Sequence, residues 1–526
     1  MFKKLVGFLL TICLLFSCAS SLVACDRGDG GKGTKVEVRN TLSECTVNIL
    51  FAVEEMPYDA TSVETAVNNQ LKKDGKPYKV HFEYTSHSNY AVTIGDYCKS
   101  GYDGAWSHVT TIQALIEQEI IKTDIMPYLD VWGSKIKQEV SAAALAQFTN
   151  YKTNKLYAIP RDMPTANDRS RVTIREDWMK EAGLNKVTTI EELDQYLAYC
   201  QNKNVGTSGF HSLMLGCGNV HLLREYCPSY YFPIDDGYYS IYVDIDSNDY
   251  KVKCMYNTEA FTAWVAKANE YMANGYVSKD SITSTENYFY NGLSAALPSY
   301  STVKMSERID AFKNVNPSAD LYEAFIESED NPKVVFFAAD NCMVALSQST
   351  HTEEFIDFLS WTKNQKNHDL LTLGVEGVNY YLTSNGRVSY VNPANSSQII
   401  PQNKRFYTYN PYYAFNDIDY QRFSANLSDE YVDMVKNCQK DDLNGQPENY
   451  ILSPLCGFNV QETSAYKTAY NRVSAALAMF GSLVDGKSGV DEISEFVSKV
   501  NANGMSDLIA EVQKQLDDYI DKKNIR

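Results

Sequence analysis

The stretch KLYAIPRDMPTANDRSRVTIREDWMKEAGLNKVTTIEELDQYLAYCQ, residues 155–201, decides the fold, because it predicts strands and helices in alternation. A short apolar strand ends at Pro160, which has no N–H to donate to further pairing. The β-branched run 172–175 predicts a second strand. Asp177 begins a helix that Gly183 ends, and Thr189 with Glu192 forms a capping box before the next helix. This order is typical of an α/β protein.

Apolar periodicity predicts further elements on both sides of this stretch. They are strands at 46–53, 78–84 and 334–338, helices at 62–72, 258–275 and 352–362, and a hairpin at 238–256. Residues 204–235 are rich in glycine and aromatic residues, which predicts an irregular loop. Near the end of the chain, Leu508, Val512, Leu516 and Tyr519 lie on one face of a predicted helix. About 500 residues are enough for two large apolar cores.

The amino terminus has the pattern of an export signal. Lys3 and Lys4 precede an apolar run, residues 5–16, that is too short to span a bilayer. The following Leu-Val-Ala-Cys ends at Cys25 and resembles the lipobox of bacterial lipoproteins. That resemblance implies cleavage before Cys25 and lipidation of its sulfur. Residues 26–34, DRGDGGKGT, predict a flexible tether.

The charge of the chain excludes some classes of partner. Removing residues 1–24 takes away two lysines and no acid, so the formal net charge changes from −18 to −20. A surface this acidic argues against nucleic acids and anionic lipids, and no run of basic residues is present.

Cysteine usage and motif searches predict neither cofactor nor metal. Three of the 12 cysteines lie in or at the end of the signal. The remaining nine form no Cys-x-x-Cys, which favours scattered reduced thiols over a disulfide framework. The spacing of Cys217, His221 and Cys227 matches no standard zinc site. Because the chain also lacks nucleophile-elbow, metalloprotease, phosphate-loop and dinucleotide motifs, we expect no enzyme activity.

The residue identities in segment 155–201 are more specific for one protein family than its apolar periodicity is. A strand ending in Tyr-Ala-Ile-Pro160, a strand ending before Asp177-Trp178, a helix closing on Gly183-Leu184, and then Thr-x-x-Glu-Leu193 are similar to the extracellular solute-binding proteins of bacterial ABC importers, family 1. The resemblance implies an α/β, two-lobed, periplasmic-binding-protein-like (type II) fold. In that family this segment leaves the first lobe, crosses the hinge and builds the second.

The last 150 residues resemble one lipoprotein branch of this family, the LipO-like branch, which has its own C-terminal domain. Residues 373–380, LGVEGVNY, residues 453–458, SPLCGF, and the closing helices carry this resemblance. It implies a largely helical C-terminal region. The block 407–413 departs from the branch, since it lacks the expected Trp and Gly.

These features predict the organisation of the chain. The expected parts are a signal peptide, 1–24; the lipidated Cys and tether, 25–44; a first lobe, 45–160 with 334–372; a second lobe, 161–333; and a C-terminal region packing on the lobes, 373–526.

Candidate ligand contacts follow from the resemblance and from the aromatic content. The family has a Tyr-Asp strand that leads into a loop at the ligand cleft, and here Tyr102-Asp103 precedes Trp106. Aromatic faces bury the apolar faces of sugar rings, and this chain has 38 tyrosines and five tryptophans. The candidate ligand-binding residues are Trp106, Tyr231, Tyr300, Asp340, Asn341 and Tyr412, with Asp162 and Met163 beside the hinge strand as secondary candidates.

The sequence therefore predicts a lipid-anchored solute receptor of an ABC importer on the extracytoplasmic face of the cell membrane. We expect a monomer that captures a small solute, an oligosaccharide, between two closing lobes and presents it to the importer permease. Three alternatives stay open at this point: a peptide-binding protein, an adhesin, and a carbohydrate-active surface enzyme.

Overall fold

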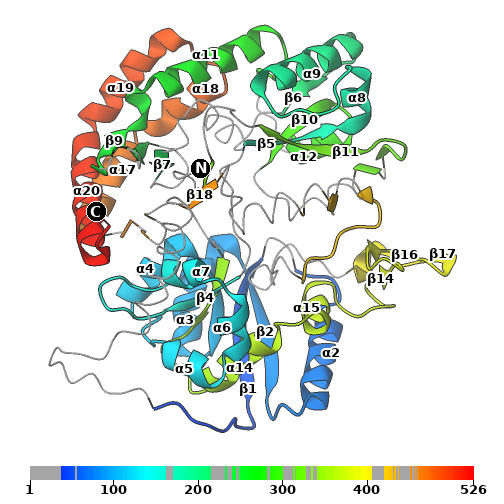
Figure 1. The fold of residues 1–526 in the computed structure, drawn as a ribbon, viewed down its shortest axis with the longest axis vertical. Helices are drawn as coiled ribbons and strands as arrows, with labels where there is room; N and C mark the ends of the chain where they lie inside the picture. The colour runs from blue at the N-terminus through cyan, green and yellow to red at the C-terminus, as the bar shows by residue number, and fades with distance from the viewer. Residues whose placement is uncertain are drawn as a thin grey trace, which may run out of the picture.

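The structure is a computed structural model whose two largest sheets lie in separate parts of the molecule (Figure 1). It describes residues 37–53, 56–161, 170–214, 231–233, 240–244, 247, 249–280, 285–299, 312–313, 315–326, 333–335, 341–405, 420–429, 432–433, 436, 450–452, 455, 458, 460–461 and 463–525. We call the part built on strand β1 the first lobe and the part built on strand β5 the second lobe.

The first lobe contains a five-stranded sheet in the order β2-β1-β3-β13-β4. Its strands are β2 (Lys79–Ser86), β1 (Thr46–Val53), β3 (Gly104–His108), β13 (Asn341–Ala345) and β4 (Ala158–Pro160). β1 is parallel to β2 and β3, whereas β13 is antiparallel to β3 and β4. The carboxyl ends of β1, β2, β3 and β4 therefore meet at one edge, where β13 begins.

Helices from both ends of the first-lobe sequence cover this sheet. They are α2 (Ala60–Lys73), α3 (His87–Lys99), α4 (Ile112–Glu117), α5 (Met126–Val131), α6 (Ser134–Glu139), α7 (Ala142–Gln147), α14 (Thr352–Trp361) and α15 (Gln365–Thr372). The apolar faces of α2 and β1 predicted from periodicity are buried in one core, which gathers residues from 47–159 and 342–371. The predicted strands 46–53 and 78–84 and the predicted helices 62–72 and 352–362 are confirmed.

The second lobe contains a four-stranded sheet in the order β11-β5-β10-β6. Its elements are β5 (Ser170–Arg175), β6 (His211–Leu213), β10 (Ser294–Ser299), β11 (Leu321–Ile326), α8 (Glu176–Glu181), α9 (Ile190–Lys203), α11 (Glu259–Ala273) and α12 (Thr285–Tyr290). The order predicted for residues 155–201 is confirmed. Gly183 has a positive φ of 79° after α8, and the Thr189 hydroxyl accepts from the Glu192 N–H, which satisfies an otherwise unpaired donor of α9.

Two predictions about strands were wrong in part. The segment predicted as an irregular loop contains β6 and β7 (Tyr231–Pro233), which are only three residues long and so show no periodicity. Pairing with β10, which lies far along the sequence, stabilises β6, and pairing with the following strand β8 (Ile241–Asp244) stabilises β7. The strand predicted at 334–338 is β12 (Lys333–Val335), and it pairs with β18 (Tyr450–Leu452) rather than with the first-lobe sheet.

The C-terminal region packs on both lobes. Its elements are β14 (Tyr381–Leu382), β15 (Val388–Ser389), β16 (Val391–Asn392), β17 (Asn395–Ile399), α17 (Ser464–Ser474), α18 (Phe480–Val484), α19 (Ile493–Ala502) and α20 (Met505–Lys523). The helices share the second-lobe core with α11 and β9 (Val252–Cys254), and Phe480 and Phe496 pack on Tyr256. The face predicted for α20 is buried there. The 373–405 segment instead contacts the first lobe, where Lys404 pairs with Asp59 at 3.0 Å.

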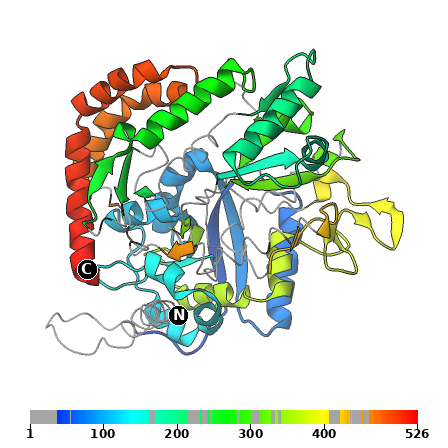
Figure 2. The ribbon, with the colours of Figure 1, turned by 45° about the horizontal axis from the view of Figure 1, so that its top comes forward.

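The C-terminal helix also contacts a residue that precedes β4. The Tyr151 ring packs edge-on against Tyr519 with ring centres 5.2 Å apart, and its hydroxyl donates to Asp518 at 3.2 Å. In both views α20 lies on one side of the molecule and the hairpin β16–β17 on the other (Figures 1 and 2). Among the described helices, none has the length and apolar composition required to cross a membrane.

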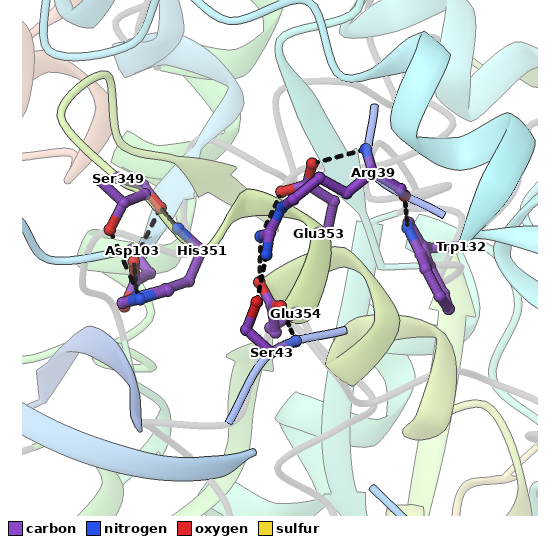
Figure 3. A network of polar contacts seen from close by, with 9 residues as sticks. Arg39, Ser43, Asp103, Trp132, Ser349, His351, Glu353 and Glu354 are labelled. Carbon is purple, nitrogen blue, oxygen red and sulfur yellow. Dashed lines mark hydrogen bonds and ion pairs between the residues drawn. The ribbon is translucent and has the colours of Figure 1, made fainter. Parts of the chain in front are cut away.

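A buried polar network lies where the described chain begins, at the amino-terminal edge of the first-lobe sheet (Figure 3). The Arg39 guanidinium bonds Glu353 and Glu354 at 2.8 Å each, and Glu354 is fully buried. Burial alone would raise the pKa of Glu353, but hydrogen bonds from the Arg39 side chain and backbone outweigh it and hold this pKa below its ordinary value. The contact between Arg39 and Glu353 therefore stabilises the fold at pH values above the pKa that Glu353 has in the unfolded chain. This stabilisation is lost as the pH falls through the lower pKa of Glu353 in the folded protein.

We expect Arg39→Met to lower the free energy of unfolding by about 2–3 kcal/mol, because it leaves the buried Glu354 carboxylate without its cation. Adding Glu354→Gln should restore part of this loss, since the neutral amide still accepts from the Ser43 N–H. Urea unfolding of wild type, both single variants and the double variant measures the coupling. Strictly additive losses would show that the pair contributes no coupling energy.

Candidate functional site

The candidate site lies at the carboxyl edge of the first-lobe sheet, where the chain crosses toward the second lobe. Arg161 follows β4 at this edge, and β5 of the second lobe begins only nine residues later, at Ser170. β13 returns to the first lobe at the same edge with Asn341. Ligands of open α/β sheets bind beyond the carboxyl ends of the strands.

Register places three polar or aromatic side chains on one face of the sheet here. Asn341 pairs with His108 and Met343 pairs with Trp106, so Trp106, His108 and Asn341 project to the same side. Trp106 lies within strand β3 and not on the predicted loop, because β13 pairs with β3 as far as His108. The local sequence contains no sign of this partner, which is 235 residues away.

Trp106 is half-buried and its ring orientation is constrained from two sides. Its indole N–H donates to the side-chain oxygen of Asn341 at 2.8 Å. The rings of His87 and Tyr90, on α3, meet the indole edge-on, with ring centres 5.4 and 5.3 Å away. A large aromatic ring that is already held in one orientation loses little conformational entropy when a ligand binds it.

Asn341 was predicted as a ligand contact, and the structure gives its side chain a bond within the protein. Only 3% of Asn341 is exposed, and its side-chain oxygen is the acceptor for Trp106. Its backbone carbonyl accepts from the Arg161 N–H at 3.0 Å, which joins β13 to the end of β4. Asn341 therefore orients Trp106 in this structure, and a direct role toward a ligand stays a prediction.

Sequence reasoning missed His87 and Tyr90. Ser86 caps α3, and Tyr90, Ile94 and Cys98 then form its buried face, so the spacing of four residues could have indicated burial of Tyr90. Burial raises the pKa of Tyr90 well above its ordinary value, so its phenol is neutral at physiological pH. The contact of Tyr90 with Trp106 follows only from the packing of α3 on the sheet.

The structure does not place the other candidates. Tyr231 lies in β7, but its side chain is outside the described part, as are Tyr300, Asp340 and Tyr412 and the secondary candidates Asp162 and Met163. Cys25 and the predicted tether also lie outside the described residues. The site residues that the structure brings together are Trp106 and Asn341.

The described residues at this edge favour noncovalent recognition. They supply a half-exposed indole, the exposed imidazole of His87 and the partly exposed His108. Within the described ranges, no three His, Cys, Asp or Glu side chains are arranged to hold a metal ion. Among the described residues, Cys45, Cys98, Cys200, Cys254 and Cys342 form no disulfide.

This chain resembles known proteins in its structure. No family model matches the chain, and no curated protein sequence matches it. The solved structure of an N-glycan transport solute-binding protein, NgtS from Streptococcus pneumoniae, is similar with a TM-score of 0.68 and 17% identity, covering 91% of this chain and 99% of that one. An HMO-binding, ABC-transporter-associated solute-binding protein from Bifidobacterium longum infantis is similar with a TM-score of 0.61 and 14% identity, covering 91% and 99%.

A third similar structure is the alginate-binding protein AlgQ2 without calcium ion, with a TM-score of 0.57 and 14% identity over 91% of this chain and 99% of that chain. Identities this low establish the fold alone. They confirm the predicted two-lobed, periplasmic-binding-protein-like α/β fold. The chain has the architecture of the solute-binding proteins that serve ABC transporters, and these structural neighbours are binding proteins.

Proposed function

We propose that this protein is an oligosaccharide receptor that delivers its solute to an ABC importer. The observation that carries the proposal is Trp106, a half-buried indole held by Asn341 and Tyr90 at the edge where the two lobes are joined. An aromatic face fixed in this way suits the apolar face of a sugar ring. The structural neighbours described as N-glycan, HMO and alginate binders support this class of solute.

Binding would draw the lobes together about the two crossing segments. We propose the predicted boundaries for these lobes, with 45–160 and 334–372 in the first, 161–333 in the second and 373–526 as the C-terminal region. A ligand that contacts both lobes favours the closed arrangement by its additional contacts there, and the permease would recognise that arrangement. The protein would act as a monomer and would not transform its solute.

The first test is a thermal-shift screen with neutral oligosaccharides, each at about a hundredfold excess over its dissociation constant, where binding to the folded state alone stabilises by roughly 2.7 kcal/mol. We expect a neutral sugar to raise the melting temperature and to be recovered unchanged. Stabilisation by peptides alone, or conversion of the sugar into product, would contradict the proposal.

Binding should depend little on salt. The chain carries a net charge of −18, and stacking with neutral hydrogen bonds is not screened, whereas attraction to an ion is weakened beyond about 8–10 Å near physiological ionic strength. Titration calorimetry in low and high salt measures this directly. A steep loss of affinity with salt would indicate a charged solute instead.

We further propose that Cys25 is lipidated and holds the receptor on the extracytoplasmic face of the cell membrane. The support is the signal-like amino terminus ending in Leu-Val-Ala-Cys. A Cys25→Ala chain should therefore appear in the aqueous phase of a detergent partition, while wild type enters the detergent phase, because a single residue that carries two acyl chains is a stable anchor. Equal partitioning of both chains would contradict lipidation at this residue.

A further inference from the structure

Residues 420–427 connect the two lobes through side-chain contacts. We call this segment the strap. It lies in the C-terminal region, and consecutive residues of the strap have partners in different lobes: Arg422 binds the first lobe and Phe423 packs on the second. Side chains of an extended chain alternate in direction, which allows this arrangement.

The first-lobe end of the strap is polar. The Arg422 guanidinium meets the Asp369 carboxylate, on α15, through Nε and Nη2, with a shortest distance of 2.9 Å. Gln365, on the same helix, donates to the Tyr420 carbonyl at 2.9 Å, and the Tyr420 hydroxyl donates to Glu139 on α6 at 2.9 Å. Asp369 is only 5% exposed. Burial alone would raise the pKa of Asp369, but hydrogen bonds from His368, Arg422 and Gln365 keep this pKa below its ordinary value.

The second-lobe end of the strap is apolar. Phe423 and Leu427 are 6% and 7% exposed. They belong to a small core, separate from those of the two lobes, whose other members include Met214, Phe289, Leu297, Phe312 and Leu321 around β10, β11 and α12. Burial of two large apolar side chains attaches this end to the second lobe without directional bonds.

We propose that the strap is a tether between the lobes and that the Arg422–Asp369 pair is its releasable contact, which limits how far the lobes separate. At the first-lobe end, the partly exposed Arg422 guanidinium can replace its bonds to Asp369 by bonds to water. At the second-lobe end, exposing Phe423 and Leu427 to water would not be compensated by any new bond. The strap also pairs with hairpin β14–β15, because the Val388 N–H donates to the Phe423 carbonyl and the Ala425 N–H donates to the Val388 carbonyl. The inference rests on the proposed closure of the lobes, but its test requires no ligand.

The experiment measures the distance between the lobes in the unliganded full chain. Spin labels on genetically encoded residues replace Val92 in the first lobe and Val205 in the second, which are 74% and 79% exposed. This labelling avoids the native thiols. The variants that break the strap contact are Arg422→Ala and Asp369→Asn. The matched control is Arg472→Ala, which breaks an ion pair between α17 and α20, because Arg472 pairs with Asp507 and neither residue belongs to the strap.

We expect Arg422→Ala and Asp369→Asn to broaden the distance distribution toward longer separations, with the ratio of open to closed populations rising about five- to tenfold. Arg472→Ala should give the wild-type distribution. The proposal is overturned if either strap variant is folded and keeps the wild-type distances, since the contact would then contribute only local stability. A shifted distribution together with no binding of any oligosaccharide would support the strap while contradicting the proposed function.

Discussion

Replacing Trp106 with alanine should weaken oligosaccharide binding about a hundredfold, which corresponds to roughly 2.7 kcal/mol of binding free energy. The loss combines the stacking surface of the indole with the orientation that Asn341, His87 and Tyr90 impose on it. Such concentration of binding energy in one aromatic residue is usual in binding sites. Titration calorimetry with the best sugar from the screen measures the effect.

The same change should also cost stability, because Trp106 is half-buried and not in an open loop. It removes the indole hydrogen bond to the side-chain oxygen of Asn341, which is 3% exposed, together with the packing of a half-buried ring, and we expect a loss of about 1–3 kcal/mol. Trp106→Phe removes the same hydrogen bond but keeps an aromatic face. It should therefore lose similar stability and much less affinity, so the two variants separate the two effects.

Trp132→Phe is the matched control for these variants. Trp132 is another half-buried tryptophan of the first lobe, and its indole N–H donates to the Arg39 carbonyl at 2.9 Å, near the amino-terminal edge of the sheet. Its replacement should reduce stability and leave affinity unchanged. If Trp106→Ala binds the sugar as wild type does, the site is elsewhere.

The largest effect on stability is expected for Gly486→Ala. Gly486 follows α18 with a φ of +72°, and a Cβ atom there would lie 2.1 Å from the Ala268 carbonyl oxygen and 2.5 Å from its carbon, within helix α11. Both are backbone atoms in a helix interior, so no side chain can move aside. The loop is also held by the Asn269 side chain, which donates to the carbonyls of Gly486 and Ser488.

We expect this variant to lose about 3–5 kcal/mol, from left-handed backbone strain together with the displacement of the loop from α11. Gly275→Ala provides the control, because Gly275 has nearly the same φ, +73°, and no atom lies within 4 Å of its added Cβ. That variant should lose only about 1–2 kcal/mol, the cost of a left-handed non-glycine residue. Equal losses in urea unfolding would show that the contact with α11 is not tight.

Local patterns predicted the elements whose determinants are close together in the sequence. The Thr189 cap and the apolar spacing that follows it are sufficient for α9, and the continuous apolar run of β1 is sufficient for a buried strand. The short strand β6 escaped prediction, because three residues carry no periodicity. A strand was predicted where β12 lies, but its pairing with β18 was not. Both β6 and β12 pair with strands far along the chain.

At the candidate site, too, the residues could be selected from the sequence but their contact could not. Trp106 could be selected from the sequence as an aromatic residue after a predicted strand, and Asn341 as a polar residue before another. Their contact could not be predicted, since it depends on the antiparallel register of β13 against β3. A shift of one residue in that register would send one of the two side chains to the opposite face.

What the sequence determined by itself is therefore the succession of strands and helices, the acidic charge and the signal-like amino terminus, because these depend on residue types and on spacings of a few positions. Tertiary structure alone decided that β13 brings Asn341 to Trp106, that α3 places Tyr90 against the indole, and that Arg422 and Phe423 contact different lobes. These contacts join residues far apart in sequence, and their free energy comes from burial and pairing that exist only after the lobes have folded.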